Sequence, residues 1–144
     1  SMKENLFITA PFYCDYGFNI SVGKNFYTNH NVTILDGAKV TFGDYVFIAP
    51  NCVFSTAGHA IDSEQRCEGM EIALPITVGD HVWIGTNVSV LPGVTIGSDT
   101  IIGAGSVVNK DIPSGVIAAG NPCRVIRRIT EADKNKYPVF EDAR

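Results

Sequence analysis

Three histidines are the residues of this chain best suited to proton transfer near neutral pH: His30, His59 and His81. An imidazole titrates at about pH 6.5, so its neutral form can take a proton from a hydroxyl group as a general base. A lone histidine is usually a polar surface residue, and we interpret His30 and His81 in this way. His59 differs because it follows Gly58 in a segment that lacks the regular pattern of the flanking sequence. We therefore predict that His59 carries the chemistry.

Four basic residues near the end of the chain could hold an anion such as phosphate: Lys110, Arg124, Arg127 and Arg128. The chain as a whole has 11 Lys and Arg against 15 Asp and Glu, which gives a formal charge of −4. This balance argues against a surface for nucleic acid or anionic lipid, so an anion site must be a local cluster. On a regular strand Arg124 and Arg128 share a face, whereas Arg127 faces the other way unless the strand bends.

The four cysteines, Cys14, Cys52, Cys67 and Cys123, are irregularly spaced and form no C-x-x-C pair. The residues after Met2 do not begin a signal peptide, and no apolar stretch approaches the ~20 residues that a membrane span needs. We therefore interpret the cysteines as free thiols and expect a cytoplasmic protein that does not contact a membrane.

Most of the remaining chain repeats every six residues, as in Ile76-Thr-Val-Gly79 and Val82-Trp-Ile-Gly85. A period of six does not fit a helix, but it fits a short strand, in which positions one and three point the same way, followed by a corner. Glycine at position four suits a corner that needs a positive φ or a close backbone approach. The units begin at Ile20, Phe26, Val32, Val40, Val46 and Cys52 in a first block, and at Ile76, Val82, Val88, Val94, Thr100 and Ser106 in a second.

Short strands joined by tight corners predict an all-β parallel β-helix, with positions one and three of each unit in the core. The alternative is an antiparallel sandwich of short strands, which would not hold the six-residue register through so many units. Residues 55–75 interrupt the period, so we expect them to leave the β-helix as an extruded loop. Loops of this length in a compact domain are usually functional.

The C-terminal region, residues 121–144, is predicted to cap the open end of the β-helix. It contains a basic strand over residues 123–129 and a short helix that starts at Thr130 with a capping-box signature. Residues 1–144 would together form a single domain, since the length suits one domain and not two.

Several segments go beyond the bare repeat: Asn51 to His59, Arg66-x-x-Gly69, Pro75 to Gly85 with its Trp83-Ile-Gly, Gly103 to Pro113, and Gly120-Asn-Pro-Cys-Arg124-Val-Ile-Arg127. These segments resemble the maltose and galactoside O-acetyltransferases, which are hexapeptide-repeat acyltransferases. The resemblance implies that the coils form a three-sided prism and are left-handed. The periodicity alone does not give this handedness. The relatives also begin with a helical segment that is absent from this chain.

The resemblance further implies an acetyl-CoA-dependent O-acetyltransferase that moves an acetyl group directly to a hydroxyl of a sugar or a similar small acceptor. His59 would be the general base, and the amide between Gly85 and Thr86 would stabilise the oxyanion. The residues expected to bind acetyl-CoA are Trp83, Ala104, Lys110, Arg124 and Arg127. Those expected to bind the acceptor are Asp15, Asn29, Asp36 and Glu71.

The group that orients the imidazole of His59 stays open between Asp62, Glu71 and a backbone carbonyl. The family is trimeric, with sites between subunits, so we expect His59 to face the acetyl-CoA groove of a neighbouring chain. Exposed apolar side chains on a flat prism face, such as Phe42, Tyr45 and Phe47, would be covered by threefold packing.

Other functions remain as alternatives to O-acetyl transfer. The acceptor could be an amino sugar or a xenobiotic, which would make the protein an N-acetyltransferase, or the fold could serve as a non-enzymatic trimeric scaffold. Acylation of Cys67 before transfer is a further possibility. A carbonic anhydrase of the same fold needs three histidines on zinc, but His30 and His81 occupy different repeat positions, so we expect no metal.

Overall fold

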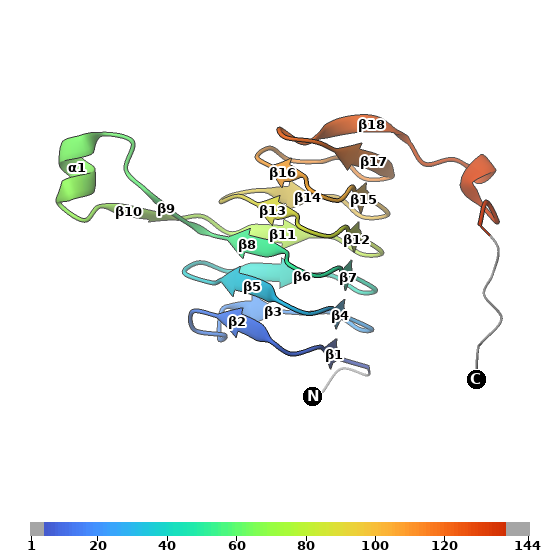
Figure 1. The fold of residues 1–144 in the computed structure, drawn as a ribbon, viewed down its shortest axis with the longest axis horizontal. Helices are drawn as coiled ribbons and strands as arrows, with labels where there is room; N and C mark the ends of the chain where they lie inside the picture. Colours follow the sequence, from blue (N-terminus) through green and yellow to red (C-terminus); the bar gives the residue numbers. More distant parts are fainter. Residues whose placement is uncertain (1–4, 138–144) are drawn as a thin grey trace.

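The structure is a computed structural model, and it describes residues 5–137. Its strands form three sheets around one core, and a two-stranded hairpin stands apart from them (Figure 1). Sheet 1 contains β1 (Phe7–Ile8), β4 (Tyr27–Thr28), β7 (Phe47–Ile48), β12 (Trp83–Ile84), β15 (Ile101–Ile102), β17 (Val116–Ala119) and β18 (Arg124–Arg128). Sheet 2 contains β2 (Phe12–Cys14), β5 (Val32–Leu35), β8 (Val53–Ser55), β13 (Ser89–Val90) and β16 (Val107–Val108). Sheet 3 contains β3 (Ile20–Ser21), β6 (Val40–Phe42), β11 (Ile76–Val78) and β14 (Thr95–Ile96).

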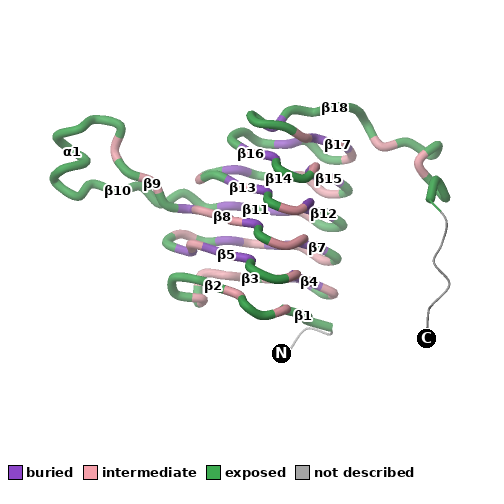
Figure 2. The backbone as a smooth tube through the Cα atoms, in the orientation of Figure 1, coloured by how far each residue is buried: buried purple, intermediate pink, exposed green. Residues whose placement is uncertain are grey.

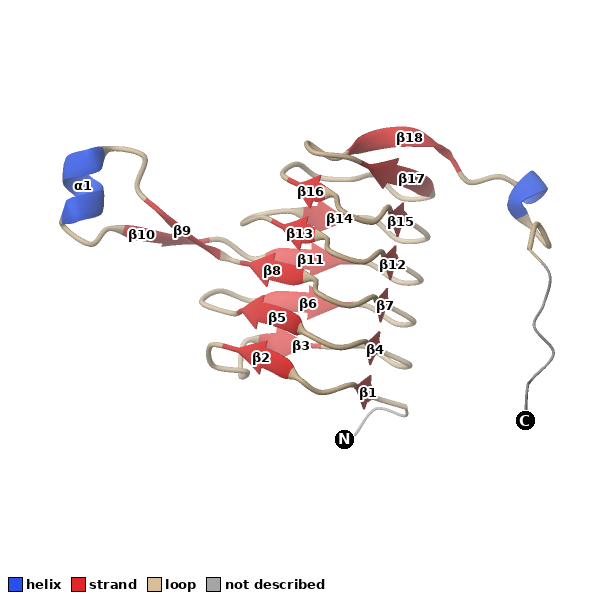
Figure 3. Ribbon diagram, in the orientation of Figure 1, coloured by secondary structure: helices blue, strands red, loops and turns tan. Residues whose placement is uncertain are grey.

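The chain visits sheets 1, 2 and 3 in turn, and each coil stacks on the one before it. Equivalent strands of successive coils pair in parallel, so that Trp83 in β12 lies between Phe47 in β7 and Ile101 in β15. This is a three-sided parallel β-helix, and the prediction from the six-residue period is confirmed (Figure 3).

Positions one and three of the repeat fill the core, as predicted (Figure 2). One expectation was wrong: Phe42 does not lie on the outer face, because it is the third residue of its unit and is only 2% exposed. Tyr45 and Phe47, at other repeat positions, are exposed. The buried residues at these positions include Val40, Val46, Ile48, Ile76, Val82, Ile84, Val88, Ile96 and Ile102.

Two roles were proposed for the corner glycines, close backbone approach and a positive φ. In the structure these two features occur at different positions of the repeat. A Cβ added to Gly79 at position four would lie 2.7 Å from the backbone nitrogen of Ser98 in the next coil. Close approach of stacked coils therefore explains the glycines at this corner. The left-handed backbone occurs at position six, where Asn87 and Asp99 have φ values of 57° and 55°. Asparagine and aspartate adopt this conformation more readily than most residues.

The interruption of the repeat leaves the prism, as predicted, but it is an ordered hairpin and not an irregular loop. Strands β9 (Ala57–His59) and β10 (Glu71–Ala73) pair antiparallel, and helix α1 (Ser63–Cys67) forms the tip. The side chain of Asp62 caps this helix by accepting a hydrogen bond from the backbone N–H of Gln65, at 3.0 Å. Figure 1 shows the hairpin projecting from the corner between sheets 2 and 3, on the side of the prism opposite sheet 1.

The described part of the C-terminal region, residues 121–137, pairs with the last coil of the prism. Strand β18 pairs antiparallel with β17 at the edge of sheet 1, and the N–H of Cys123 donates to the carbonyl of Val107 in β16, at the edge of sheet 2. The helix after Thr130 is a single 3-10 turn, η1 (Glu131–Asp133), with the predicted capping box between Thr130 and Asp133. The rest of the predicted cap, residues 138–144, lies outside the described residues. Within residues 5–137 no helix is long and apolar enough to cross a membrane.

Candidate active site

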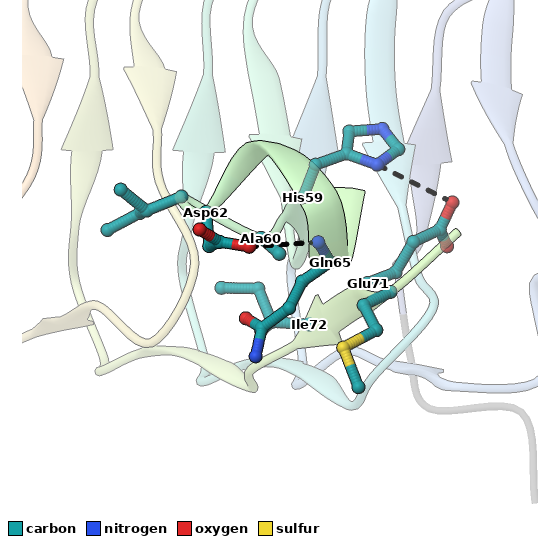
Figure 4. Close-up of a pocket in the computed structure, with 8 residues that line it drawn as sticks. His59, Ala60, Asp62, Gln65, Glu71 and Ile72 are labelled. Atoms are coloured by element: carbon teal, nitrogen blue, oxygen red, sulfur yellow. Dashed lines mark hydrogen bonds and ion pairs between the residues drawn. The ribbon is translucent and has the colours of Figure 1, made fainter. Parts of the chain in front are cut away.

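The hairpin places His59 and Glu71 opposite each other. The two residues are cross-strand partners of β9 and β10, and the imidazole Nδ1 is 3.8 Å from the carboxylate Oε1 of Glu71 (Figure 4). Both side chains are about two-thirds exposed, at 65% and 64%. Asp62, the other acidic candidate for orienting the ring, points to the cap of helix α1 instead. Of the two carboxylates, Glu71 is therefore the one that faces His59.

A cavity of ≈ 790 Å³ lies against His59, between the hairpin strands and helix α1 (Figure 4). The guanidinium of Arg66 donates hydrogen bonds to the carbonyls of Ala60 and Ile61, both at 3.0 Å, and so fixes the chain that follows His59. The apolar part of this lining was not predicted from the sequence, although the aliphatic residues of the interrupting segment were a usable signal. The lining residues are His59, Ala60, Ile61, Asp62, Gln65, Met70, Glu71 and Ile72.

The root of the hairpin is held by Thr56, whose role was not predicted from the sequence. Its side chain is fully buried, and its hydroxyl donates to the carbonyl of Leu35 at 2.7 Å and accepts from the N–H of Ala38 at 3.0 Å. The carbonyl of Thr56 accepts from the N–H of Leu74 on the returning strand at 2.9 Å. Both strands of the hairpin are thereby fixed to the corner between sheets 2 and 3.

Thr86 and Ala104 occupy position five of successive coils, in a column at the corner between sheets 1 and 2, while Asn29 lies at position four of a lower coil at the same corner. The N–H of Gly105 donates to the carbonyl of Thr86 at 2.8 Å, which stacks the upper two coils of this column. The N–H of Gly85 is occupied, because it donates to the carbonyl of Ile102. Within the described residues the N–H of Thr86 makes no hydrogen bond, so this amide is available to an oxyanion.

Asp36 does not have the predicted role of an acceptor ligand. Its carboxylate is fully buried and accepts hydrogen bonds from the backbone N–H groups of Asp15, Tyr16, Gly17 and Asn19, at 2.8–3.3 Å. Burial alone would raise the pKa of this carboxyl, but the backbone hydrogen bonds outweigh burial and hold the pKa below its usual value. Asp36 therefore shapes the turn that presents Asp15, whose own side chain is exposed.

Arg124 and Arg127 lie on the same side of β18, which resolves the conflict in their expected directions. Arg124 is opposite Ala119 and Arg127 is opposite Ile117, while the register shifts between these pairs and leaves Ile126 without a partner. This bulge restores a common face because Ala119 and Ile117 point outward together on β17. Arg124 also donates to the side chain of Asn109 at 3.2 Å, next to Lys110 in the sequence.

Trp83 is 53% exposed on the outer face of sheet 1 and lines a second cavity, of ≈ 230 Å³. Because the hairpin leaves the opposite side of the prism, His59 does not meet Trp83 within one chain (Figure 1). The other two histidines are exposed surface residues: Nδ1 of His30 is 2.6 Å from the carbonyl oxygen of Ala10, and Nδ1 of His81 is 3.2 Å from Oδ1 of Asp99. Residues 5–137 contain no cluster of three metal-ligating side chains, and all four cysteines are free thiols.

Comparisons with known proteins place this geometry in a family. Residues 75–110 match the family described as Bacterial transferase hexapeptide (six repeats). The galactoside O-acetyltransferase of Escherichia coli (strain K12) is 53% identical over 142 residues, which are 99% of this chain and 69% of that protein. A solved galactoside acetyltransferase in complex with coenzyme A superimposes with a TM-score of 0.92 at 51% identity, over 96% of this chain and 69% of that one. A maltose O-acetyltransferase from Clostridium difficile 630 gives a TM-score of 0.86 at 48% identity, over 89% of this chain and 69% of that one.

Superposition at this level also fixes the hand of the coil, so the β-helix is left-handed, as the resemblance implied. The match with the Escherichia coli relative spans 99% of this chain, so it includes both the repeat and the segment that carries His59. The chain belongs to the hexapeptide-repeat acetyltransferases of the galactoside and maltose O-acetyltransferase type.

Proposed function

We propose that this protein transfers the acetyl group of acetyl-CoA to a hydroxyl of a sugar or similar small acceptor, with His59 as the general base. Family membership supports acetyl transfer and acetyl-CoA as the donor, because a related galactoside acetyltransferase holds coenzyme A. The observation that carries the choice of base is the position of His59, opposite Glu71 at a cavity on the extruded hairpin.

His59 does the proton chemistry in this proposal. Its neutral imidazole takes the proton of the acceptor hydroxyl as that oxygen forms a bond to the acetyl carbonyl carbon. The N–H of Thr86 donates to the carbonyl oxygen as negative charge develops on it. When the carbon–sulfur bond breaks, the imidazolium gives the proton to the departing sulfur, so His59 returns to its neutral form.

The residues at the C-terminal end of the prism suit a phosphate-bearing donor. Lys110, Arg124 and Arg127 supply positive charge, and the bulge in β18 turns both arginines to the same side. Thr86 and Ala104 line the corner below them, where small side chains leave room for the pantetheine arm. Trp83 completes the donor site in this proposal, from the outer face of sheet 1.

The acceptor is assigned to Asp15 and Asn29, whose carboxylate and amide can pair with hydroxyl groups, whereas Glu71, which faces the imidazole, is assigned to orienting His59. The Oδ1 atom of Asn29 already accepts from the N–H of His30 at 2.7 Å, so its NH2 group is the part left for an acceptor. Asp36 contributes indirectly, by holding the turn that contains Asp15.

The site is proposed to be completed by a second copy of the chain in a homotrimer. Three observations support this: the hairpin extends away from its own prism, Ile61 is 98% exposed on it, and sheet 1 presents Phe47 and Trp83 to the outside. An isolated two-stranded hairpin is only marginally stable, so its apolar side chains need a neighbouring surface. In the trimer, His59 of one chain faces the acetyl-CoA groove of the next.

The test is a panel of acceptors assayed with acetyl-CoA, with release of free thiol as the readout. The panel contains mono- and disaccharides, amino sugars and aminoglycoside-type amines. The proposal predicts acceptor-dependent thiol release with hydroxyl acceptors and an acetyl ester as the product. Transfer to amines alone would identify an N-acetyltransferase, and no transfer at all would favour a non-enzymatic scaffold. A stable acetyl adduct on Cys67, seen by intact mass without acceptor, would contradict direct transfer.

A further inference from the structure

Arg127, one of the proposed phosphate ligands, is already bound to an internal carboxylate. Its Nη1 donates to Oδ2 of Asp133 and its Nη2 donates to Oδ1, both at 2.8 Å, which is a two-pronged contact. Asp133 also accepts from the N–H of Thr130 at 2.9 Å, within the capping box of η1. The guanidinium and this N–H hold the pKa of Asp133 well below its usual range, so the carboxylate stays ionised near neutral pH.

The ion pair holds the segment after β18 across a cavity from Trp83, the single tryptophan of the chain. We call residues 129–137 the C-terminal strap. The cavity of ≈ 230 Å³ lies between the outer face of sheet 1 and this strap. Trp83, Ile101 and Ile117 form the sheet side of the cavity, and the strap side consists of Ile129, Asp133, Lys136 and Tyr137 beside Arg127.

The carboxylate of Asp133 offsets the charge of Arg127, so Arg127 adds little positive charge to the donor site while the pair is intact. Arg124 differs, because the partners of its guanidinium are neutral: the side chain of Asn109 and the carbonyl of Cys123. Arg127 keeps its Nε edge for another anion, but the nearby carboxylate repels that anion. A phosphate group that binds Arg127 must therefore compete with Asp133.

We infer that the Arg127–Asp133 pair is a latch, and that the phosphate end of the donor opens it and frees the C-terminal strap from Trp83. This inference rests on the proposed function, because it takes Arg127 as a ligand of the donor phosphates. Donor binding at one end of the prism thereby changes access to Trp83 on the outer face of sheet 1.

The test uses adenosine 3′,5′-bisphosphate, which carries phosphates like those of CoA but has no pantetheine arm to reach Trp83. Because the chain has one tryptophan, acrylamide quenching of its fluorescence reports on Trp83 alone. Saturating bisphosphate is expected to raise the quenching constant of the wild-type protein. If the bisphosphate binds, as measured by calorimetry, but the quenching constant does not change, the latch is excluded while the donor site stands. If the bisphosphate does not bind, the donor site and the latch both fail.

Two variants separate a latch from a general charge effect. Asp133→Asn keeps a side-chain oxygen for the cap, should raise quenching without ligand, and should bind bisphosphate about two- to fivefold more tightly. Arg127→Gln should raise quenching equally but weaken binding. Glu131→Gln is the matched control, since it removes the same charge from the same turn outside the ion pair, and it should leave quenching as in the wild type. Weaker binding by Asp133→Asn would overturn the inference, and circular dichroism establishes that each variant is folded.

Discussion

Glu71 lies directly across the extruded hairpin from His59, with its Oε1 atom 3.8 Å from the imidazole Nδ1. This distance is longer than a hydrogen bond, but rotation of either exposed side chain would close it. A carboxylate that accepts from Nδ1–H leaves Nε2 as the proton acceptor. The hairpin register thus offers a physical means of orienting the proposed base.

We predict that Glu71 acts through His59. Glu71→Gln should lower kcat about tenfold, as expected when a base is less well oriented, with a smaller change in KM for acetyl-CoA. The double variant with His59→Ala should be no slower than His59→Ala alone, because Glu71 has no imidazole left to orient. Glu68→Gln, which removes a charge from the end of helix α1, is the control. If Glu71→Gln lowered kcat by the same factor in the wild-type protein and in His59→Ala, Glu71 would act independently of His59.

If the active sites are shared between chains, mixing two inactive variants should restore activity. One variant carries His59→Ala, and the other carries Lys110→Glu with Arg124→Glu. In a one-to-one mixture half of the hairpins and half of the grooves are intact, so random reassembly into trimers should recover about a quarter of the wild-type activity. The measurement is activity after joint dissociation and refolding, compared with each variant refolded alone. A site built within one chain would give no recovery.

Asp36 should contribute to stability in a pH-dependent way. Asp36→Asn should lower the free energy of unfolding by about 3 kcal/mol at pH 7, because it weakens the hydrogen bonds that the buried carboxylate accepts from four backbone N–H groups. The pKa of Asp36 is depressed in the folded protein, so its contribution is complete above the unfolded-state pKa of about 3.9. The contribution is lost as the pH falls through the lower folded-state value. Urea unfolding of both proteins at fixed concentration, from pH 7 to pH 3, should show the two midpoints converging. A constant difference would contradict the assignment.

Gly79 should be intolerant of a side chain although its φ is not left-handed. Gly79→Ala would place a Cβ 2.7 Å from the backbone nitrogen of Ser98, and separating the two coils should cost about 1–3 kcal/mol. Where there is room, the same change usually stabilises a protein by reducing the freedom of the unfolded chain. Ala49→Gly, at the same repeat position of another corner, should change stability by less than about 1 kcal/mol. A neutral or stabilising effect of Gly79→Ala in thermal unfolding would contradict the close-packing explanation.

The six-residue period was sufficient to predict the sheets and the core, because alternation along a short strand decides which side chains are buried. Phe42 shows the strength of this rule: its place in the repeat gives the correct burial, whereas its aromatic character suggested an exposed contact. The period could not predict the hand of the coil, which came from the resemblance, nor the pairing of β9 with β10, which lies outside the repeat.

The local contacts of the candidate site residues could not be predicted from the sequence. The sequence around Asp36 does not show whether its carboxylate is buried and bound by backbone N–H groups or is free to bind an acceptor. The direction of Arg127 depends on a bulge at Ile126, and the strict alternation assumed for a strand does not anticipate an extra residue. Its pairing with Asp133 depends on how the chain turns back after β18.

The most direct test of the account is the kcat/KM of His59→Ala on a hydroxyl acceptor identified by the panel. His81→Asn is the control, since it removes another exposed imidazole at a left-handed position that asparagine tolerates. We predict that His59→Ala lowers kcat/KM by about 10²–10⁴-fold, the usual contribution of a general base, while His81→Asn stays close to wild type. A His59→Ala enzyme within about tenfold of wild type would contradict the assignment of His59 as the base.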